Sequence, residues 1–135
     1  MPTHESRQRL PDSLTRNLAV HNIGRAALLV GALSQHRYDV LHTATQDVLH
    51  QPARASLFPA MGVIFQAARD AGAYGVYLSG GGSTIAAFVA PALATDVAGA
   101  MRESAAARGL LAESRICAMS SEGATILPNG AGDAP

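Results

Sequence analysis

The chain has 135 residues, a length that suits a single domain. Hydrophobic residues make up 48% of it and charged residues 15%, which argues against a disordered chain and leaves enough apolar material for a buried core. There are 10 basic and 10 acidic residues, the net charge is zero, and no basic block stands out. The charge pattern therefore argues against nucleic acid or an anionic membrane as a partner.

The sequence indicates a soluble, cytoplasmic protein. Residues 1–7 are polar and do not resemble a signal peptide. Residues 73–95 carry no charge, but the glycine run within them and Pro91 argue against a membrane helix. Cys117 is the single cysteine, so an internal disulfide is excluded. Because Cys117 lies in an apolar run, we expect it to be a small buried side chain.

The first half of the chain predicts three helices. Residues 15–33 are apolar on most sides, which is typical of a buried helix. His21 is interpreted as part of a solvated stripe, whereas Asn22 and Arg25, three residues apart, could equally be functional or structural. A second helix is expected over residues 38–49, ending before Pro52. A third, over residues 59–72, has an apolar stripe and a C-terminal Gly72.

A glycine hairpin follows in residues 74–89. Two short runs of apolar and β-branched residues flank Ser79, three consecutive glycines, Ser83 and Thr84. A tight turn needs one or two glycines, so the surplus suggests backbone that is left bare for an anion such as phosphate. A plain turn is the alternative interpretation.

The remaining residues complete an α+β pattern. We expect a helix over residues 95–108, strands over residues 114–119 and 124–127, and a loose tail over residues 128–135. Residues 1–127 would thus form one domain, an antiparallel sheet with helices packed on one face. A β-α-β-β-α-β arrangement would need a strand before the first helix, and none fits in residues 1–12. We therefore expect a piece of a longer chain.

Several stretches together resemble homoserine kinase, a member of the GHMP small-molecule kinases. In chain order they are Thr3-x-x-x-Arg7-x-x-Leu10-Pro11, Val20-x-Asn22-x-x-Arg25-x-Ala27-Leu28-Leu29, Asp47-x-Leu49-His50-Gln51-Pro52-x-Arg54 with Leu57-x-Pro59, and Gly72-Ala73-x-Gly75-x-x-Leu78-Ser79-Gly80-x-Gly82-x-Thr84. The resemblance covers residues 3–127 and implies a ferredoxin-like C-terminal domain whose first strand is missing. The glycine motif is typical of the whole superfamily, whereas the first and third stretches point to homoserine kinase.

The resemblance implies a reaction and substrate-binding residues. The family transfers the γ-phosphoryl group of ATP to the side-chain hydroxyl of L-homoserine, in threonine biosynthesis. Arg7 and Arg54 match two arginines that hold the α-carboxylate of the substrate, a pairing that suits the planar guanidinium fork. Thr3 matches an active-site threonine that orients the substrate. Asp47 and His50 lie close to Arg54 in the sequence, and we interpret them as residues that position it.

The glycine run matches the third GHMP motif, beside the nucleotide-binding loop. The matching residues are Gly80, Gly81 and Gly82. The family usually has alanine at Gly81 and proline at Ser83, so this loop is expected to be less rigid. Ala53 also replaces a common tyrosine.

The resemblance implies ATP and Mg²⁺ as cofactors, bound mostly by an N-terminal half that this sequence does not contain. Because phosphoryl transfer depends on positioning and on charge neutralisation by the metal, we expect the chain to be inactive alone. A separate N-terminal half is a possible partner, and a homodimer is another. We assign no catalytic residue and no metal ligand to this chain.

Two other functions stay open. Another GHMP kinase with a different substrate is the first, although the paired arginines favour a carboxylate. A non-catalytic ferredoxin-like module, dimerising through a sheet edge, is the second. The scattered histidines do not have the spacing of a zinc site, and Ser79 lacks the Gly-x-Ser-x-Gly elbow of a hydrolase.

Overall fold

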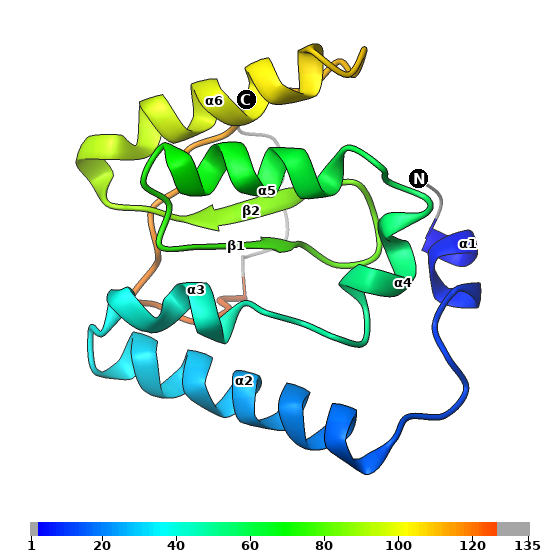
Figure 1. The fold of residues 1–135 in the computed structure, drawn as a ribbon. Coiled ribbons are helices and arrows are strands. Elements are labelled where there is room, and N and C mark those ends of the chain that lie inside the picture. Colours follow the sequence, from blue (N-terminus) through cyan, green and yellow to red (C-terminus); the bar gives the residue numbers. More distant parts are fainter. Residues whose placement is uncertain (1–2, 127–135) are drawn as a thin grey trace.

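The computed structural model describes residues 3–126 as an α+β fold, so the tail predicted over residues 128–135 lies outside the described residues (Figure 1). The helices are α1 (Thr3–Gln8), α2 (Arg16–Ser34), α3 (Leu41–Ala44), α4 (Gln51–Ala55), α5 (Met61–Asp70) and α6 (Ala94–Ala106), with short 3-10 helices η1 (Tyr38–Val40) and η2 (Pro91–Leu93). The strands are β1 (Gly75–Leu78) and β2 (Ile85–Phe88). The α+β class predicted from the sequence is confirmed.

The glycine hairpin forms as expected. Strands β1 and β2 pair antiparallel, with Gly75 opposite Phe88 and Leu78 opposite Ile85. The backbone N–H of Ser79 donates to the carbonyl of Thr84 over 2.8 Å and closes the turn. Gly80 has a φ of 67°, a left-handed conformation that glycine adopts without strain.

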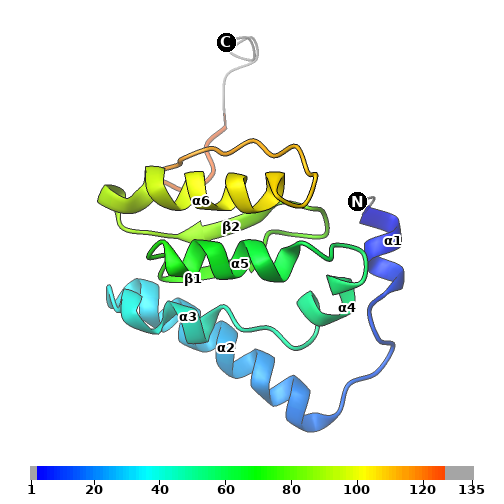
Figure 2. The same ribbon diagram turned by 45° about the horizontal axis from the view of Figure 1, so that its top comes forward.

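Helices α5 and α6 cover one face of the hairpin (Figures 1 and 2). Because side chains alternate between the faces of a strand, Val76 and Leu78 share this face, and Val76 packs in one cluster with Ala68 of α5 and Val97 of α6. The carbonyl oxygen of Leu41 lies 2.7 Å from where a Cβ would stand on Gly75. Helix α3 therefore lies against the opposite face, a layer that the sequence did not predict.

Helix α2 is exposed where the sequence predicted burial. Leu28, Leu29 and other residues on one side pack against the cluster around Leu41, but Val20, Ile23 and Val30 are 61%, 70% and 66% exposed. An apolar helix is buried only when neighbours cover it on every side, and α2 has neighbours on one side among the described residues. Within residues 3–126, no helix is long and apolar enough to cross a membrane.

The short helices differ from the expectation. The helix predicted over residues 38–49 is divided into η1 and α3 and ends at Ala44, where the Thr45 hydroxyl donates to the carbonyl of Leu41 over 2.9 Å. Helices α1 and α4 lie in segments where the sequence predicted no helix. The third predicted helix is confirmed as α5, and Gly72 ends it with a φ of 99°.

The strands predicted over residues 114–119 and 124–127 are wrong as far as the described residues extend, to Ile126. Residues 110–126 are exposed and form no strand. Cys117 is likewise exposed instead of buried. A strand exists only when a neighbouring backbone accepts its hydrogen bonds, and among the described residues these segments pair with neither β1 nor β2.

Candidate functional site

Arg54 lies at the glycine turn. Its Nη1 donates to the backbone carbonyl of Gly80 over 2.9 Å, and the residue is 7% exposed. Its Nε is also buried and has no hydrogen-bond partner among the described residues. Buried guanidinium donors are normally paired, so an unpaired one marks a place where a further acceptor would fit. The local structure thus brings Arg54 and the glycine turn together.

Asp47 holds the N-terminus of α4, the helix that carries Arg54. Its Oδ2 accepts from the backbone N–H of His50 over 2.6 Å and from that of Gln51 over 2.5 Å. Its Oδ1 lies 3.1 Å from Nδ1 of His50. Burial alone would raise the pKa of Asp47, but the bonds from Gln51, Asn22 and His50 outweigh it and lower the pKa. Asp47 therefore acts as a charged cap on the helix of Arg54.

Asn22 connects this cap to α2. Its Nδ2 donates to Oδ1 of Asp47 over 2.7 Å, and its Oδ1 accepts from the backbone N–H of Val48 over 3.1 Å. From the sequence, Asn22 could equally be structural or functional. Its contacts with Asp47 and with the backbone of Val48 are structural. Arg25, one turn further along α2, donates to Oε1 of Gln46 over 3.4 Å.

Gln51 connects α4 to the end of β1, a role that we did not predict. Its Oε1 accepts from the backbone N–H of Leu78 over 2.9 Å, and its Nε2 donates to the carbonyl of Thr45 over 3.3 Å. Leu78 immediately precedes the glycine turn. The only sequence signal for this role was that Gln51 lies between His50 and Pro52, within a stretch that resembles homoserine kinase.

Replacing Gln51 with leucine is expected to lower the free energy of unfolding by about 1–2 kcal/mol, because the N–H of Leu78 loses its acceptor. Urea unfolding would measure the loss, and amide hydrogen exchange at Leu78 would localise it. Gln66→Leu is the matched control, because Gln66 is exposed and donates to Asp70 within one helix. That control should change stability by less than about 0.5 kcal/mol. Equal losses in both variants would contradict this role of Gln51.

Replacing Asp47 with asparagine is expected to remove a pH-dependent part of the stability. The folded state lowers the pKa of Asp47 from its ordinary value of 3.8, so its contribution is full above that value and disappears as the pH falls through the folded-state pKa. We expect Asp47→Asn to be less stable by about 1 kcal/mol near pH 7 and to match the wild type at strongly acidic pH. Urea unfolding across pH measures this, with exposed Asp12→Asn as the control. A gap that does not depend on pH would exclude the ionised carboxylate as its cause.

Helix α1 lies beside α4 in both views (Figures 1 and 2). Thr3 begins α1, and Arg7 is exposed in its last turn. Ser6 is fully buried, and its Oγ has no partner among the described residues. The elements that carry Arg7 and Arg54 are therefore neighbours, while the meeting of both guanidinium groups on one carboxylate stays a prediction.

The glycine turn presents open backbone. A Cβ added to Gly80 or Gly82 would meet nothing within 4 Å, and Gly81 is half-buried between them. Among the described residues, no close neighbour therefore requires glycine at position 80 or 82. This openness fits a ligand-facing turn, which stays a prediction.

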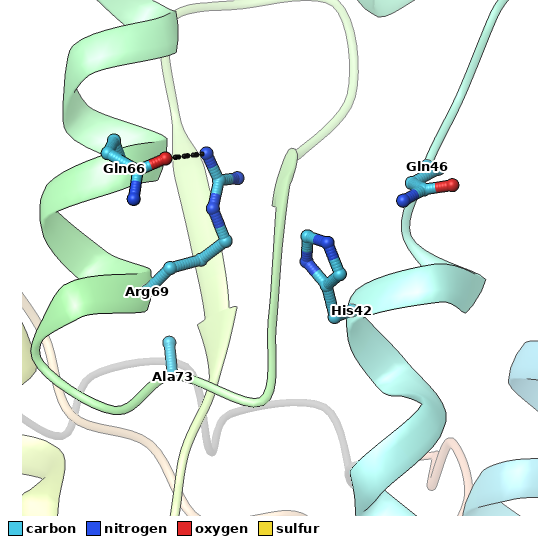
Figure 3. Close-up of a pocket in the computed structure, with 5 residues that line it drawn as sticks. All are labelled: His42, Gln46, Gln66, Arg69 and Ala73. Atoms are coloured by element: carbon cyan, nitrogen blue, oxygen red, sulfur yellow. Dashed lines mark hydrogen bonds between the residues drawn. The ribbon is translucent and has the colours of Figure 1, made fainter.

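A second, shallow hollow lies between α3 and α5, at the opposite end of β1 from the glycine turn. Figure 3 shows Arg69 and His42 extending from the two sides toward the space between them. Gln66 accepts from Nη2 of Arg69 over 2.7 Å, and Gln46 and Ala73 complete the lining. The hollow contains none of the site residues that the sequence predicted.

The chain matches a known family model. The model for the GHMP kinase C-terminal domain, described as "GHMP kinases C terminal", matches residues 20–107. This range begins in α2 and runs one residue past α6, so it includes Arg54 and the glycine turn.

Curated relatives match over nearly the whole chain. The homoserine kinase of Desulfitobacterium hafniense is 46% identical over 127 residues, covering 94% of this chain and 43% of that protein. The homoserine kinase of Synechocystis is 40% identical over 126 residues, covering 93% of this chain and 41% of that protein. The chain thus spans less than half the length of these relatives.

A solved structure agrees with the fold. The crystal structure of homoserine kinase from Cytophaga hutchinsonii superposes with a TM-score of 0.76 at 30% identity. The match covers 80% of this chain and 35% of the crystallised chain.

Proposed function

This chain belongs to the GHMP kinase C-terminal family, and on that premise we propose that it forms the substrate-binding side of a homoserine kinase. In this proposal, the chain binds the α-carboxylate of L-homoserine and holds the substrate next to the glycine turn. The transfer of the γ-phosphoryl group is completed with polypeptide that lies outside residues 1–135. The homoserine kinases that match nearly all of this chain support the choice of substrate.

One observation carries the proposal, namely the buried guanidinium of Arg54 at the glycine turn. One of its nitrogens is bonded to Gly80, and its buried Nε is without a partner among residues 3–126. A carboxylate oxygen is the acceptor that a guanidinium pairs with best. Arg7 is the second candidate donor, on the exposed side of α1. In our proposal, Thr3 assists in orienting the substrate.

The glycine turn is proposed as the phosphate side of the site. Its open Gly80 and Gly82 positions would let an anion approach backbone N–H groups. ATP and Mg²⁺ are the cofactors that the family uses, and together they supply the phosphoryl group and neutralise its charge. Among residues 3–126, no group of three His, Cys, Asp or Glu side chains could hold a metal ion. In this proposal the Mg²⁺ ligands lie mostly in the N-terminal half that the resemblance implies.

Asp47 and His50 are proposed as positioning residues for Arg54. Asp47 accepts hydrogen bonds from the first residues of α4 and so holds the helix in place. Gln51 and Arg54, on the same short helix, each bond to the hairpin near the turn. Helix α4 thereby holds together the proposed donor to the substrate carboxylate, Arg54, and the proposed phosphate-facing turn.

Calorimetric titration with L-homoserine tests the proposal directly. We expect L-homoserine to bind the full chain. We expect 3-aminopropan-1-ol, the homoserine analogue that lacks only the carboxylate, to bind at least tenfold more weakly. The physical reason is that a charged hydrogen bond contributes about 1.5–3 kcal/mol. Equal binding of both compounds, or no binding of L-homoserine, would overturn the proposal.

A further inference from the structure

The hollow between α3 and α5 is lined by hydrogen-bond donors and by no carboxylate among the described residues. Its lining consists of His42, Gln46, Gln66, Arg69 and Ala73. Arg69 supplies a permanent positive charge, and the ring of His42 carries an N–H in either neutral tautomer. Such a lining favours an anion as its occupant, because an anion accepts hydrogen bonds and a cation does not.

Arg69 keeps a charge that no carboxylate neutralises within residues 3–126. Asp70 is the next residue along the chain, but its Oδ1 accepts from Nε2 of Gln66 over 2.7 Å. The oxygen of the same amide accepts from Nη2 of Arg69 over 2.7 Å. Gln66 thus stands between the two charged groups and fixes one edge of the guanidinium. The other guanidinium nitrogens are left for a further acceptor.

Gln46 and His42 face Arg69 from the opposite wall (Figure 3). Gln46 accepts through Oε1 from Nη2 of Arg25 at 3.4 Å. Because an arginine has no acceptor, this contact turns the amide oxygen of Gln46 toward α2 and leaves its Nε2 on the side of His42. The ring of His42 makes no side-chain hydrogen bond within the described residues and extends into the space between the walls. Both walls therefore present N–H groups to one space.

We propose that this hollow binds a phosphate group, either as inorganic phosphate or as the phosphoryl end of a small phosphomonoester. A carboxylate is flat, and the fork of a single arginine satisfies it. Donors that reach in from two walls suit an anion whose oxygens point in several directions. The phosphate group lies between Arg69 on one side and His42 and Gln46 on the other.

This site is separate from the proposed substrate site. Ala73 lies two residues before β1, and Gly80 lies two residues after it. Strand β1 has four residues, and at about 3.3 Å per residue its ends are about 10 Å apart. One phosphate group cannot contact both ends. Neither Arg54 nor the glycine run is among the residues that line the hollow.

Nuclear magnetic resonance of the isotope-labelled full chain tests the site residue by residue. Inorganic phosphate is added to a phosphate-free buffer while pH and ionic strength are held constant. We expect saturable shifts at the Nε–H of Arg69, the side-chain amide of Gln46 and the ring of His42. Shifts that rise without saturation, or that are confined to residues 80–82, would overturn the proposal.

Arg69→Ala should weaken phosphate binding in the hollow at least tenfold, because it removes the permanent charge and the free guanidinium donors. The side chain of Arg69 bonds to Gln66 within the same helix, so we expect the variant to fold like the wild type. Arg102→Ala is the matched control, since it removes the same charge from an exposed position on α6 and should leave the affinity unchanged. Equal affinities of the two variants for phosphate would contradict the site.

Two further titrations distinguish the ligand class and the source of the phosphate group. We expect acetate, a flat carboxylate, to bind in the hollow at least tenfold more weakly than phosphate. Acetate that binds as tightly would overturn the choice of a tetrahedral anion. Methyl phosphate is the probe for a phosphomonoester, and the tighter of the two phosphate compounds identifies the source. No titration contains L-homoserine, so a failure here is distinguishable from a failure of the proposed substrate binding.

Discussion

Replacing Arg54 with alanine is expected to weaken L-homoserine binding about ten- to a hundredfold. In the proposed site the variant would lose a charged hydrogen bond to the carboxylate. Such a bond contributes about 1.5–3 kcal/mol, and each 1.4 kcal/mol is about a factor of ten. Arg54→Lys keeps the positive charge but not the planar guanidinium fork, so its affinity for L-homoserine should lie between those of the wild type and Arg54→Ala. Calorimetric titration at constant pH and salt measures all three proteins.

Arg69→Ala is the control for a general loss of arginine. Arg69 is half-buried and its Nη2 bonds to Gln66 in the hollow between α3 and α5, away from the glycine turn. Its variant should bind L-homoserine like the wild type. Because Arg54→Ala also loses the bond to Gly80, circular dichroism must show that it is folded. A folded Arg54→Ala variant with unchanged affinity for L-homoserine would show that Arg54 does not bind the substrate.

Replacing Gly75 with alanine is expected to destabilise the fold by about 1–3 kcal/mol, the usual range for overpacking. The added Cβ would stand 2.7 Å from the carbonyl oxygen of Leu41 and 3.1 Å from Cγ2 of Thr45. The first contact is with backbone, so either α3 or β1 must shift. Urea unfolding measures the change.

Gly62→Ala provides a contrast of opposite sign. Gly62 is the second residue of α5, is exposed, and a Cβ there would meet nothing within 4 Å. Alanine is favoured over glycine by about 0.8–1 kcal/mol in a helix interior, an upper limit for this first-turn position, so this variant should be at least as stable as the wild type. If Gly75→Ala were as stable as Gly62→Ala, the close contact between α3 and β1 would be contradicted.

The hairpin and α5 could be predicted because their signals are local. A glycine run between two β-branched segments, and an apolar stripe that ends at Gly72, each determine an element without distant partners. Helix α4 could not be predicted in this way. It has five residues, and its hydrogen bonds reach back to Asp47 and across to Leu78 and Gly80, which no local pattern reveals.

The errors share one physical cause, which is that burial and pairing depend on neighbours. Residues 114–119 have strand-forming side chains, but no neighbouring strand among the described residues pairs with them, so they stay exposed. Val20 and Ile23 of α2 are apolar but have open space beside them. For the site, the resemblance predicted Arg54 as a substrate-binding residue; the structure places it at the glycine turn, and its role stays a prediction. Gln51 was missed because no local pattern distinguishes a glutamine that bonds to a distant strand from one that lies in a turn before a proline.

The two bonds from α4 to the hairpin also determine how this region can fluctuate. A helix as short as α4 is not stable alone, so its native state depends on Gln51 and Arg54 reaching residues 27 and 26 positions further along the chain. Release of α4 from the hairpin would free the glycine turn at the same moment, as one locally unfolding unit. The turn and the guanidinium beside it are therefore ordered together or lost together.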